Sequence, residues 1–199
     1  MADITVQGVR RTVLYHILEP HELHQLYNQY EDDSLKGRRD KVMLGLLVYQ
    51  GVRTEELGKL EVGDINLREG KVAVPGGVRS NSREMQLEAY QVMDMYDYTL
   101  QIRPKVTQQP TEKLLVSASG KTDISNLMTR LMVQLRKFNP KVLNANQVRA
   151  SVITKWLKMY NLREVQYLAG HRYISSTESY QQNDMEGLIE EVQQFHPLG

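Results

Sequence analysis

Arg53, Arg149, His171 and Tyr180 have side chains of the types that phosphate chemistry can use. In general, an arginine fork binds phosphate oxygens, an imidazole adds a hydrogen bond, and a phenol can act as a nucleophile. Tyr180 follows His171 by nine residues, and Arg149 precedes His171 by 22. Taken singly, each has an ordinary interpretation: a surface arginine, a histidine after a glycine helix cap, or one of eleven tyrosines. Only their order and spacing together can carry an argument.

Other kinds of site are not expected. No glycine-rich loop precedes a Lys-Ser or Lys-Thr pair, which argues against nucleotide hydrolysis. His21 and His24 are three residues apart, whereas the two histidines of a metalloprotease helix lie at i and i+4, so we expect a polar helix face there. The chain has no cysteine, which excludes disulfides and thiolate metal sites. We expect no cofactor and no metal.

Composition indicates a soluble globular protein of one domain. The hydrophobic fraction is 41% and the charged fraction 25%. The first residues lack the basic and then apolar pattern of a signal peptide. The longest apolar stretch, Val42 to Tyr49, is too short to cross a bilayer. We therefore predict a cytoplasmic protein that makes no membrane contact.

The distribution of charge says more than the net value of +1. Residues 183–199 carry four acids and no Lys or Arg, so the preceding residues carry +5. Positions 141 to 172 contain six basic residues and one acid, Glu164. Such a surface can neutralise phosphates. On charge alone, however, an ordinary solvated helix surface is the better explanation.

The elements that must position these residues are mostly helical. Pro20 suits the first turn of a helix, Gly51 ends a second, and Thr54 is a good N-cap for a third. A small antiparallel meander is expected at 64–67, 71–74 and 84–87, and a short buried strand at 114–116. Further helices are predicted at about 88–101, 124–138, 146–160, 162–169 and 185–195. The expected fold class is mainly α with a small antiparallel β-meander.

The motifs resemble those of the tyrosine recombinase, or phage integrase, family. Leu168-Ala169-Gly170-His171, then Thr177, then Tyr180, is similar to the family signature Leu-x-Gly-His, Thr, Tyr. Residues 51–60, Gly-Val-Arg-Thr-Glu-Glu-Leu-Gly-Lys-Leu, resemble the family's first arginine box. The meander also lies where the family has one, and the resemblance covers about residues 19–195. It implies the fold of a tyrosine recombinase catalytic domain.

The resemblance also implies an activity, the cutting and rejoining of double-stranded DNA in site-specific recombination or integration, as in mobile elements. Tyr180 would attack a phosphodiester to give a 3′-phosphotyrosine and a free 5′-hydroxyl. Arg53 and Arg149 would stabilise the charge of the transition state, because fixed cations must already be aimed at the phosphate oxygens. His171 would add a third donor.

The sequence departs from the family pattern at two positions. Asn146 stands where the family usually has histidine, three residues before Arg149, and an amide cannot exchange a proton at neutral pH. Gly77 stands where the family has a lysine in the turn of the meander, the acid for the departing 5′-oxygen. Arg79 is the candidate to replace that lysine in part. Loss of general acid–base help costs about 100- to 10,000-fold per group, so we expect a slow or impaired enzyme.

The domain organisation follows from the same motifs. Residues 1–18 are expected to be an arm or linker, and residues 19–199 one catalytic domain. Residues 175–199 would form the tyrosine segment and a C-terminal helix. That helix would dock into a neighbouring protomer of a tetramer on DNA, or pack on its own domain. The alternative function is a DNA-binding module of the same fold that has lost catalysis.

Overall fold

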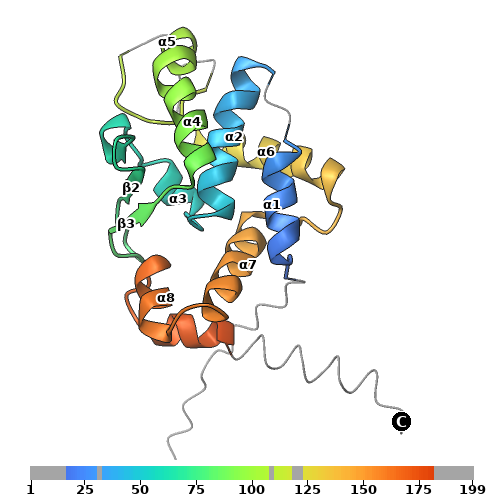
Figure 1. Cartoon of the computed structure of the whole chain (residues 1–199), viewed down its shortest axis with the longest axis vertical. Coiled ribbons are helices and arrows are strands. Elements are labelled where there is room, and N and C mark those ends of the chain that lie inside the picture. The colour runs from blue at the N-terminus through green and yellow to red at the C-terminus, as the bar shows by residue number, and fades with distance from the viewer. Residues whose placement is uncertain (1–16, 31–32, 108–109, 118–122, 182–199) are drawn as a thin grey trace, which may run out of the picture.

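A computed structural model of the chain describes residues 17–30, 33–107, 110–117 and 123–181. Its architecture is mainly helical with one small sheet, as the sequence predicts. Helix α2 (Leu35–Val48) runs through the middle, between α1 (Pro20–Asn28) and α4 (Ala89–Asp97) (Figure 1). It also contacts α6 (Ile124–Phe138) and α7 (Ala145–Leu157). Helix α2 is therefore the core around which the domain is built.

Local sequence explains where the first helices begin and end. Pro20 occupies the first turn of α1, where its missing N–H costs nothing. Ser34 caps α2, its hydroxyl accepting a hydrogen bond from the Gly37 N–H at 2.9 Å. Gly51, with φ of +54°, then redirects the chain after α2. The apolar side chains in the second half of α2 are almost wholly buried: Val42, Met43, Leu44, Leu46, Leu47 and Val48.

The predicted meander is confirmed as a three-stranded antiparallel sheet in the order β1-β2-β3. Its strands are β1 (Ile65–Asn66), β2 (Lys71–Val74) and β3 (Arg83–Gln86), and β1 follows a 3-10 turn, η1 (Val62–Asp64). Val72 pairs with Ile65 on one side and Met85 on the other. Val72 and Val74 face the core while Ala73 is exposed, so one side of the sheet is covered and the other faces outward.

Two expectations differ from the structure in this part of the chain. The helix expected at about 88–101 is α4, which continues through a π-helical segment, η2 (Tyr98–Ile102), into α5 (Arg103–Val106). The strand expected at 114–116 is wrong. These residues are buried, but their ladder contacts within the described chain are limited to the Glu61–Lys113 bridge and the Leu114 N–H, which donates to Leu60 O at 2.8 Å. Burial alone does not make a strand, because a strand needs a partner along its length.

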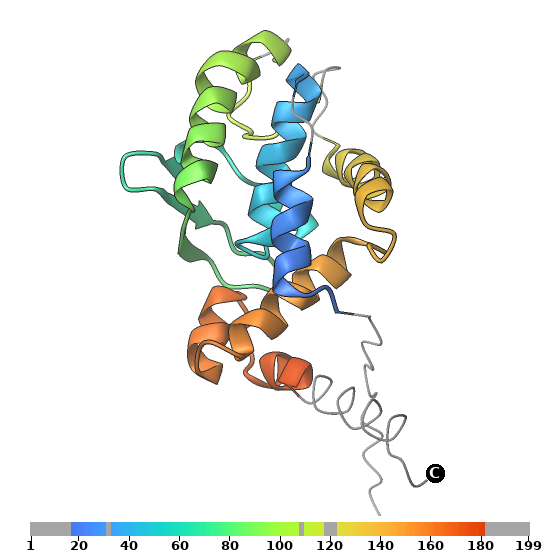
Figure 2. The same cartoon turned by 45° about the vertical axis from the view of Figure 1, so that its right-hand side comes forward.

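The C-terminal part of the described chain lies at one end of the domain. Helix α8 (Leu162–Leu168) and the helical residues 175–181 lie together there, next to α7 (Figures 1 and 2). Helix α8 also contacts β3, so this end abuts the sheet. Within the described ranges, no helix has the length and apolarity needed to span a membrane. The expected arm at 1–18, except for its last two residues, and the helix at about 185–195 lie outside the described residues.

Candidate active site

Arg53 is held by the helix that it precedes. It is the N-cap of α3 (Thr54–Leu57), so the prediction that Thr54 is the cap is wrong by one residue. The reason is that Glu56 reaches back and its carboxylate accepts the Arg53 backbone N–H at 2.9 Å. Leu57 is fully buried and anchors the helix. The Arg53 side chain is 29% exposed, so it remains partly accessible to a ligand.

Glu56 also joins this helix to the sheet through a buried ion pair. Both side chains are fully buried, and Arg83 on β3 donates from Nη1 and Nη2 to the two carboxylate oxygens, at 3.1 and 3.0 Å. Burial alone would raise the pKa of Glu56, but the paired Arg83 and the Arg53 N–H hold that pKa below its usual value. The sequence motifs did not identify Glu56 or Arg83 as part of the site. The glutamate three residues after Arg53 was the available indication.

Arg149 joins three segments from within α7. It is 3% exposed, and its guanidinium donates to Gly51 O and to Ala169 O, the latter at 2.7 Å. These contacts tie the start of the arginine box to the end of α8. Burial, together with the nearby positive charge of Arg53, lowers the pKa of Arg149 to about 9. A buried cation this close to a second one favours an anion between them.

His171 contacts Arg149 directly. Its Nε2 lies 3.3 Å from Arg149 Nη2, and its Nδ1 lies 2.9 Å from the hydroxyl of Thr177. Because a guanidinium can only donate, Nε2 must accept, and the proton of the neutral ring is then on Nδ1, facing Thr177. Burial and the charges of Arg149 and Arg53 lower the pKa of His171 to about 3. In this state the imidazole is neutral at physiological pH.

Gly170 sets the direction in which His171 enters the site. Its φ is +63°, a conformation that a residue with a Cβ adopts only with strain. The Gly170 carbonyl accepts the Asn81 N–H at 2.9 Å, and His171 forms a bridge with Ser80. A Cβ on Gly170 would lie 2.5 Å from Arg83 Nη1. Only glycine allows this close approach between the end of α8 and the turn after β2.

Tyr180 lies against the histidine. Residues 175–181 are helical, and the partly buried Tyr180 ring stacks on the His171 ring at 5.8 Å between centroids and 13° between planes. Thr177, fully buried on the same segment, holds the other edge of the imidazole. Arg149, His171 and Tyr180 therefore form a continuous group. Arg53 lies near enough for its charge to lower the pKa of both Arg149 and His171.

This group is strongly basic. Among the described residues of this group there are three guanidinium groups, of Arg53, Arg83 and Arg149, and one carboxylate, of Glu56. The net charge is therefore positive. Each of the three keeps a buried Nε that has no hydrogen-bond partner in the described part of the chain. The excess of positive charge favours an anion beside the partly exposed Arg53 side chain. The arrangement can therefore bind a phosphate.

The remaining predicted residues are Asn146 and Arg79. Asn146 is exposed in the first turn of α7 and lines a surface hollow together with Thr54. Arg79 is exposed in the turn between β2 and β3. Within the described residues, no hydrogen bond joins either side chain to Arg149, His171 or Tyr180. The same residues contain no cluster of three or more His, Cys, Asp or Glu side chains that could hold a metal ion.

Comparison with known proteins identifies the family of this chain. The sequence model of the phage integrase family matches residues 16–186, which include every residue of the group. The chain belongs to the phage integrase family. Tyrosine recombinase XerC of Vibrio cholerae is 28% identical over 183 residues, covering 90% of this chain and 58% of that protein. Tyrosine recombinase XerD of Staphylococcus epidermidis is 30% identical over 185 residues, covering 91% and 62%. This integrase-family chain thus spans about three fifths of the length of these relatives.

Solved structures show the same fold. The crystal structure of XerA recombinase matches with a TM-score of 0.72 at 24% identity, over 92% of this chain and 66% of that one. XerH recombinase bound to a palindromic difH substrate, a post-cleavage complex, matches with a TM-score of 0.72 at 19% identity, over 88% and 52%. Identities this low show the fold alone. The integrase-family chain therefore has the tyrosine recombinase catalytic-domain fold that the motifs predict.

Proposed function

We propose that this chain cleaves and rejoins double-stranded DNA in site-specific recombination through a 3′-phosphotyrosine. The observation that carries the proposal is the contact of buried Arg149 with His171, on whose ring Tyr180 stacks. A nucleophile, a neutral imidazole and a net positive pocket then meet at one place. Relatives named as tyrosine recombinases support the same activity.

The proposed reaction is a transesterification that conserves phosphate-ester bonds. The oxygen of Tyr180 forms a bond to phosphorus, the bond from phosphorus to the 5′-oxygen breaks, and the phenol proton leaves to solvent while the 5′-oxygen takes one up. Arg53 and Arg149 stabilise the negative charge that gathers on the non-bridging oxygens. In the second half, a 5′-hydroxyl attacks the phosphotyrosine and releases Tyr180. No external energy source is required.

His171 changes role when the phosphate binds. In the structure its Nε2 accepts from Arg149, so it cannot donate to a ligand while that contact is made. Burial and the positive charges of Arg149 and Arg53 keep the ring neutral. A phosphodiester anion would offset these charges and draw the Arg149 donor away. The imidazole can then take up a proton on Nε2 and donate to the phosphate. Asn146, one helical turn before Arg149, is proposed to hydrogen-bond the same region.

The test uses a nicked double-stranded substrate that traps the covalent product. The parent protein should form a species that carries DNA on a denaturing gel. Tyr180→Phe should abolish it, because no other group on the ring can form the ester. Tyr173→Phe, an exposed tyrosine on the same stretch of chain, is the matched control and should keep the parent yield. Covalent product that persists in Tyr180→Phe would refute the assignment.

A second candidate is a DNA-binding module of the same fold without catalysis. Asn146 and Gly77, at the positions of the family's histidine and lysine, favour it. Such a module would bind DNA with strong salt dependence, because phosphate contacts release counterions, and would give no covalent product.

We further propose assembly on DNA, as a tetramer, through the C-terminal helix predicted at about 185–195. A cytoplasmic location stays a prediction.

A further inference from the structure

Gly77 lies in the turn between β2 and β3, and it leaves a space that another residue fills. A Cβ built on Gly77 would lie 3.4 Å from the Nζ of Lys59 and 3.3 Å from the hydroxyl oxygen of Ser80. The φ of Gly77 is not positive, so the backbone itself does not demand glycine here. The ammonium of Lys59 thus reaches the turn from outside it, where a side chain of residue 77 would begin.

The backbone of Lys59 is fixed at both of its polar groups. Its N–H donates to Glu56 O at 2.9 Å, and its carbonyl accepts from Lys113 Nζ at 3.1 Å. Lys113 is itself held by Glu61 at 2.8 Å. Leu60, the next residue, is fully buried. The flexible lysine side chain therefore starts from a firmly placed point, directly after the helix that carries Arg53 at its N-cap.

The turn that Lys59 reaches is joined to the active site. The Gly77 N–H donates to Ser80 O at 3.0 Å, and Ser80 in turn forms a bridge with His171. Arg172, next to His171, donates from Nη2 to Gly77 O at 3.2 Å. Lys59 is therefore linked to His171 through Gly77 and Ser80. Its ammonium lies at the turn that meets the end of α8.

We propose that Lys59 is the general acid that protonates the departing 5′-oxygen. This inference rests on the proposed function. During cleavage, a proton passes from Lys59 Nζ to the 5′-oxygen as its bond to phosphorus breaks, which leaves a neutral amine and a 5′-hydroxyl. During joining, the amine takes the proton back from the attacking 5′-hydroxyl. Lysine suits both steps because an ammonium exchanges its proton, whereas the guanidinium of Arg79 stays charged.

A simpler role for Lys59 is a salt contact with the DNA backbone. A sulfur atom in place of the bridging 5′-oxygen separates the two roles. A thiol, with a pKa of about 8.5, leaves as a thiolate without a proton. An ordinary hydroxyl, whose pKa lies far above that of a thiol and far above neutral pH, needs one. A variant that lacks only the acid is therefore slow on the oxygen substrate and recovers on the sulfur substrate, while a variant that lacks a DNA contact is equally weakened on both.

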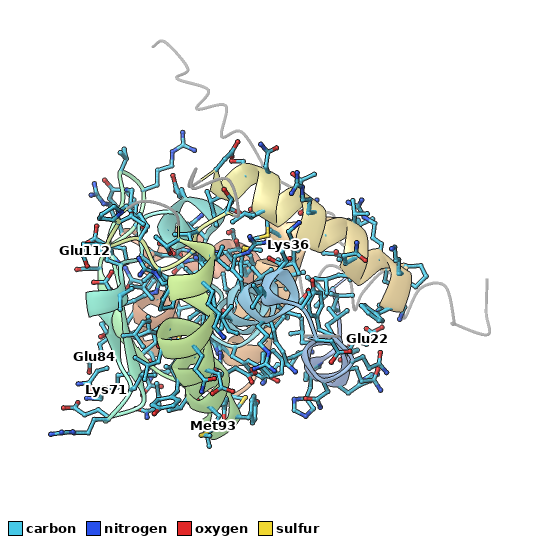
Figure 3. All side chains as sticks on the ribbon, turned by 90° about the horizontal axis from the view of Figure 1, so that it is seen from above. Glu22, Lys36, Lys71, Glu84, Met93 and Glu112 are labelled. Atoms are coloured by element: carbon cyan, nitrogen blue, oxygen red, sulfur yellow. The ribbon has the colours of Figure 1, made fainter. Side chains whose placement is uncertain are left out.

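The experiment measures single-turnover cleavage of nicked DNA carrying either atom. Lys59→Ala and Lys59→Arg should both be slower than the parent by about 100- to 10,000-fold on the oxygen substrate, and within about tenfold of it on the sulfur substrate. Lys59→Arg matters because it keeps the charge and loses the proton donor. Lys71→Ala is the matched control. The Lys71 ammonium is engaged by Glu84 at 2.9 Å on the outward face of the sheet (Figure 3), so this variant should leave both rates unchanged.

The outcomes separate the inference from the proposed function. If the parent forms no covalent product with either substrate, the proposed function fails. If the parent cleaves and Lys59→Arg keeps its rate on the oxygen substrate, or Lys59→Ala is equally slow on both, Lys59 is not the acid. An Arg79→Ala variant that alone shows the slow oxygen and fast sulfur pattern would transfer the role to Arg79 and overturn the inference.

A transplanted lysine gives a second, independent measurement. Combining Lys59→Ala with Gly77→Lys removes the ammonium that would crowd the new side chain and returns a lysine to the turn. On the oxygen substrate, the double variant should cleave at least tenfold faster than Lys59→Ala alone. No recovery, with unfolding unchanged from the parent, would contradict the inference that a lysine at this turn supplies the proton.

Discussion

The neutral state of His171 has a consequence for stability in mild acid. Burial beside Arg149 and Arg53 lowers the pKa of His171 from 6.5 to about 3 in the folded protein. Between these two pH values, the unfolded chain binds a proton at His171 that the folded chain does not bind. The contribution of the neutral His171 to the unfolding free energy is therefore fully present above pH 6.5 and is lost progressively as the pH falls toward 3.

The size of the effect follows from the two pKa values. The unfolded state gains about 2 kcal/mol relative to the folded state by pH 5, and about 5 kcal/mol once the pH falls below 3. His171→Gln removes the ionisable group and keeps an oxygen that can accept from Arg149. The difference in unfolding free energy between parent and variant should thus shrink by about 2 kcal/mol between pH 7.5 and pH 5.

Urea unfolding at pH 7.5, 6 and 5, followed by circular dichroism, measures this difference. Acidic side chains titrate in the same range, but they are common to both proteins and cancel in the subtraction. Parallel pH profiles for parent and His171→Gln would refute the reasoning, because they would mean that the folded and unfolded states bind the His171 proton equally well. A parent that gains unfolding free energy relative to His171→Gln as the pH falls would be a stronger contradiction.

Two further predictions concern the contacts that hold the site together. Glu56→Gln leaves Arg83 buried without its partner and should lower the unfolding free energy by about 3–5 kcal/mol in urea; a loss below about 1 kcal/mol would contradict the ion pair. Gly170→Ala should cost about 2 kcal/mol or more, from its φ of +63° and the approach of Arg83. Gly63→Ala, which meets no atom within 4 Å in the described part of the chain, is its control and should stay within about 0.5 kcal/mol, so equal losses would show that no clash exists at Gly170.

Elements whose bounds depend on neighbouring residues were predictable. Helix α6 runs from Ile124 to Phe138, as its apolar periodicity predicts, and β2 spans the expected residues 71–74. Elements that depend on distant partners were not. The segment at 114–116 is buried but has no strand beside it among the described residues, and the cap of α3 is Arg53, since Glu56 reaches back to its N–H. Burial and capping both depend on atoms that local patterns do not specify.

The sequence by itself indicated the family and the fold class and predicted the four residues of the site, because the order and spacing of its motifs resemble those of the family. Only the tertiary structure decided which groups surround them. The Arg83–Glu56 pair joins residues 27 positions apart, and Lys59 meets Gly77 across the turn. The neutral imidazole of His171 is likewise a product of packing. Charge, protonation and proton transfer depend on distances through space, and these exist only once the chain has folded.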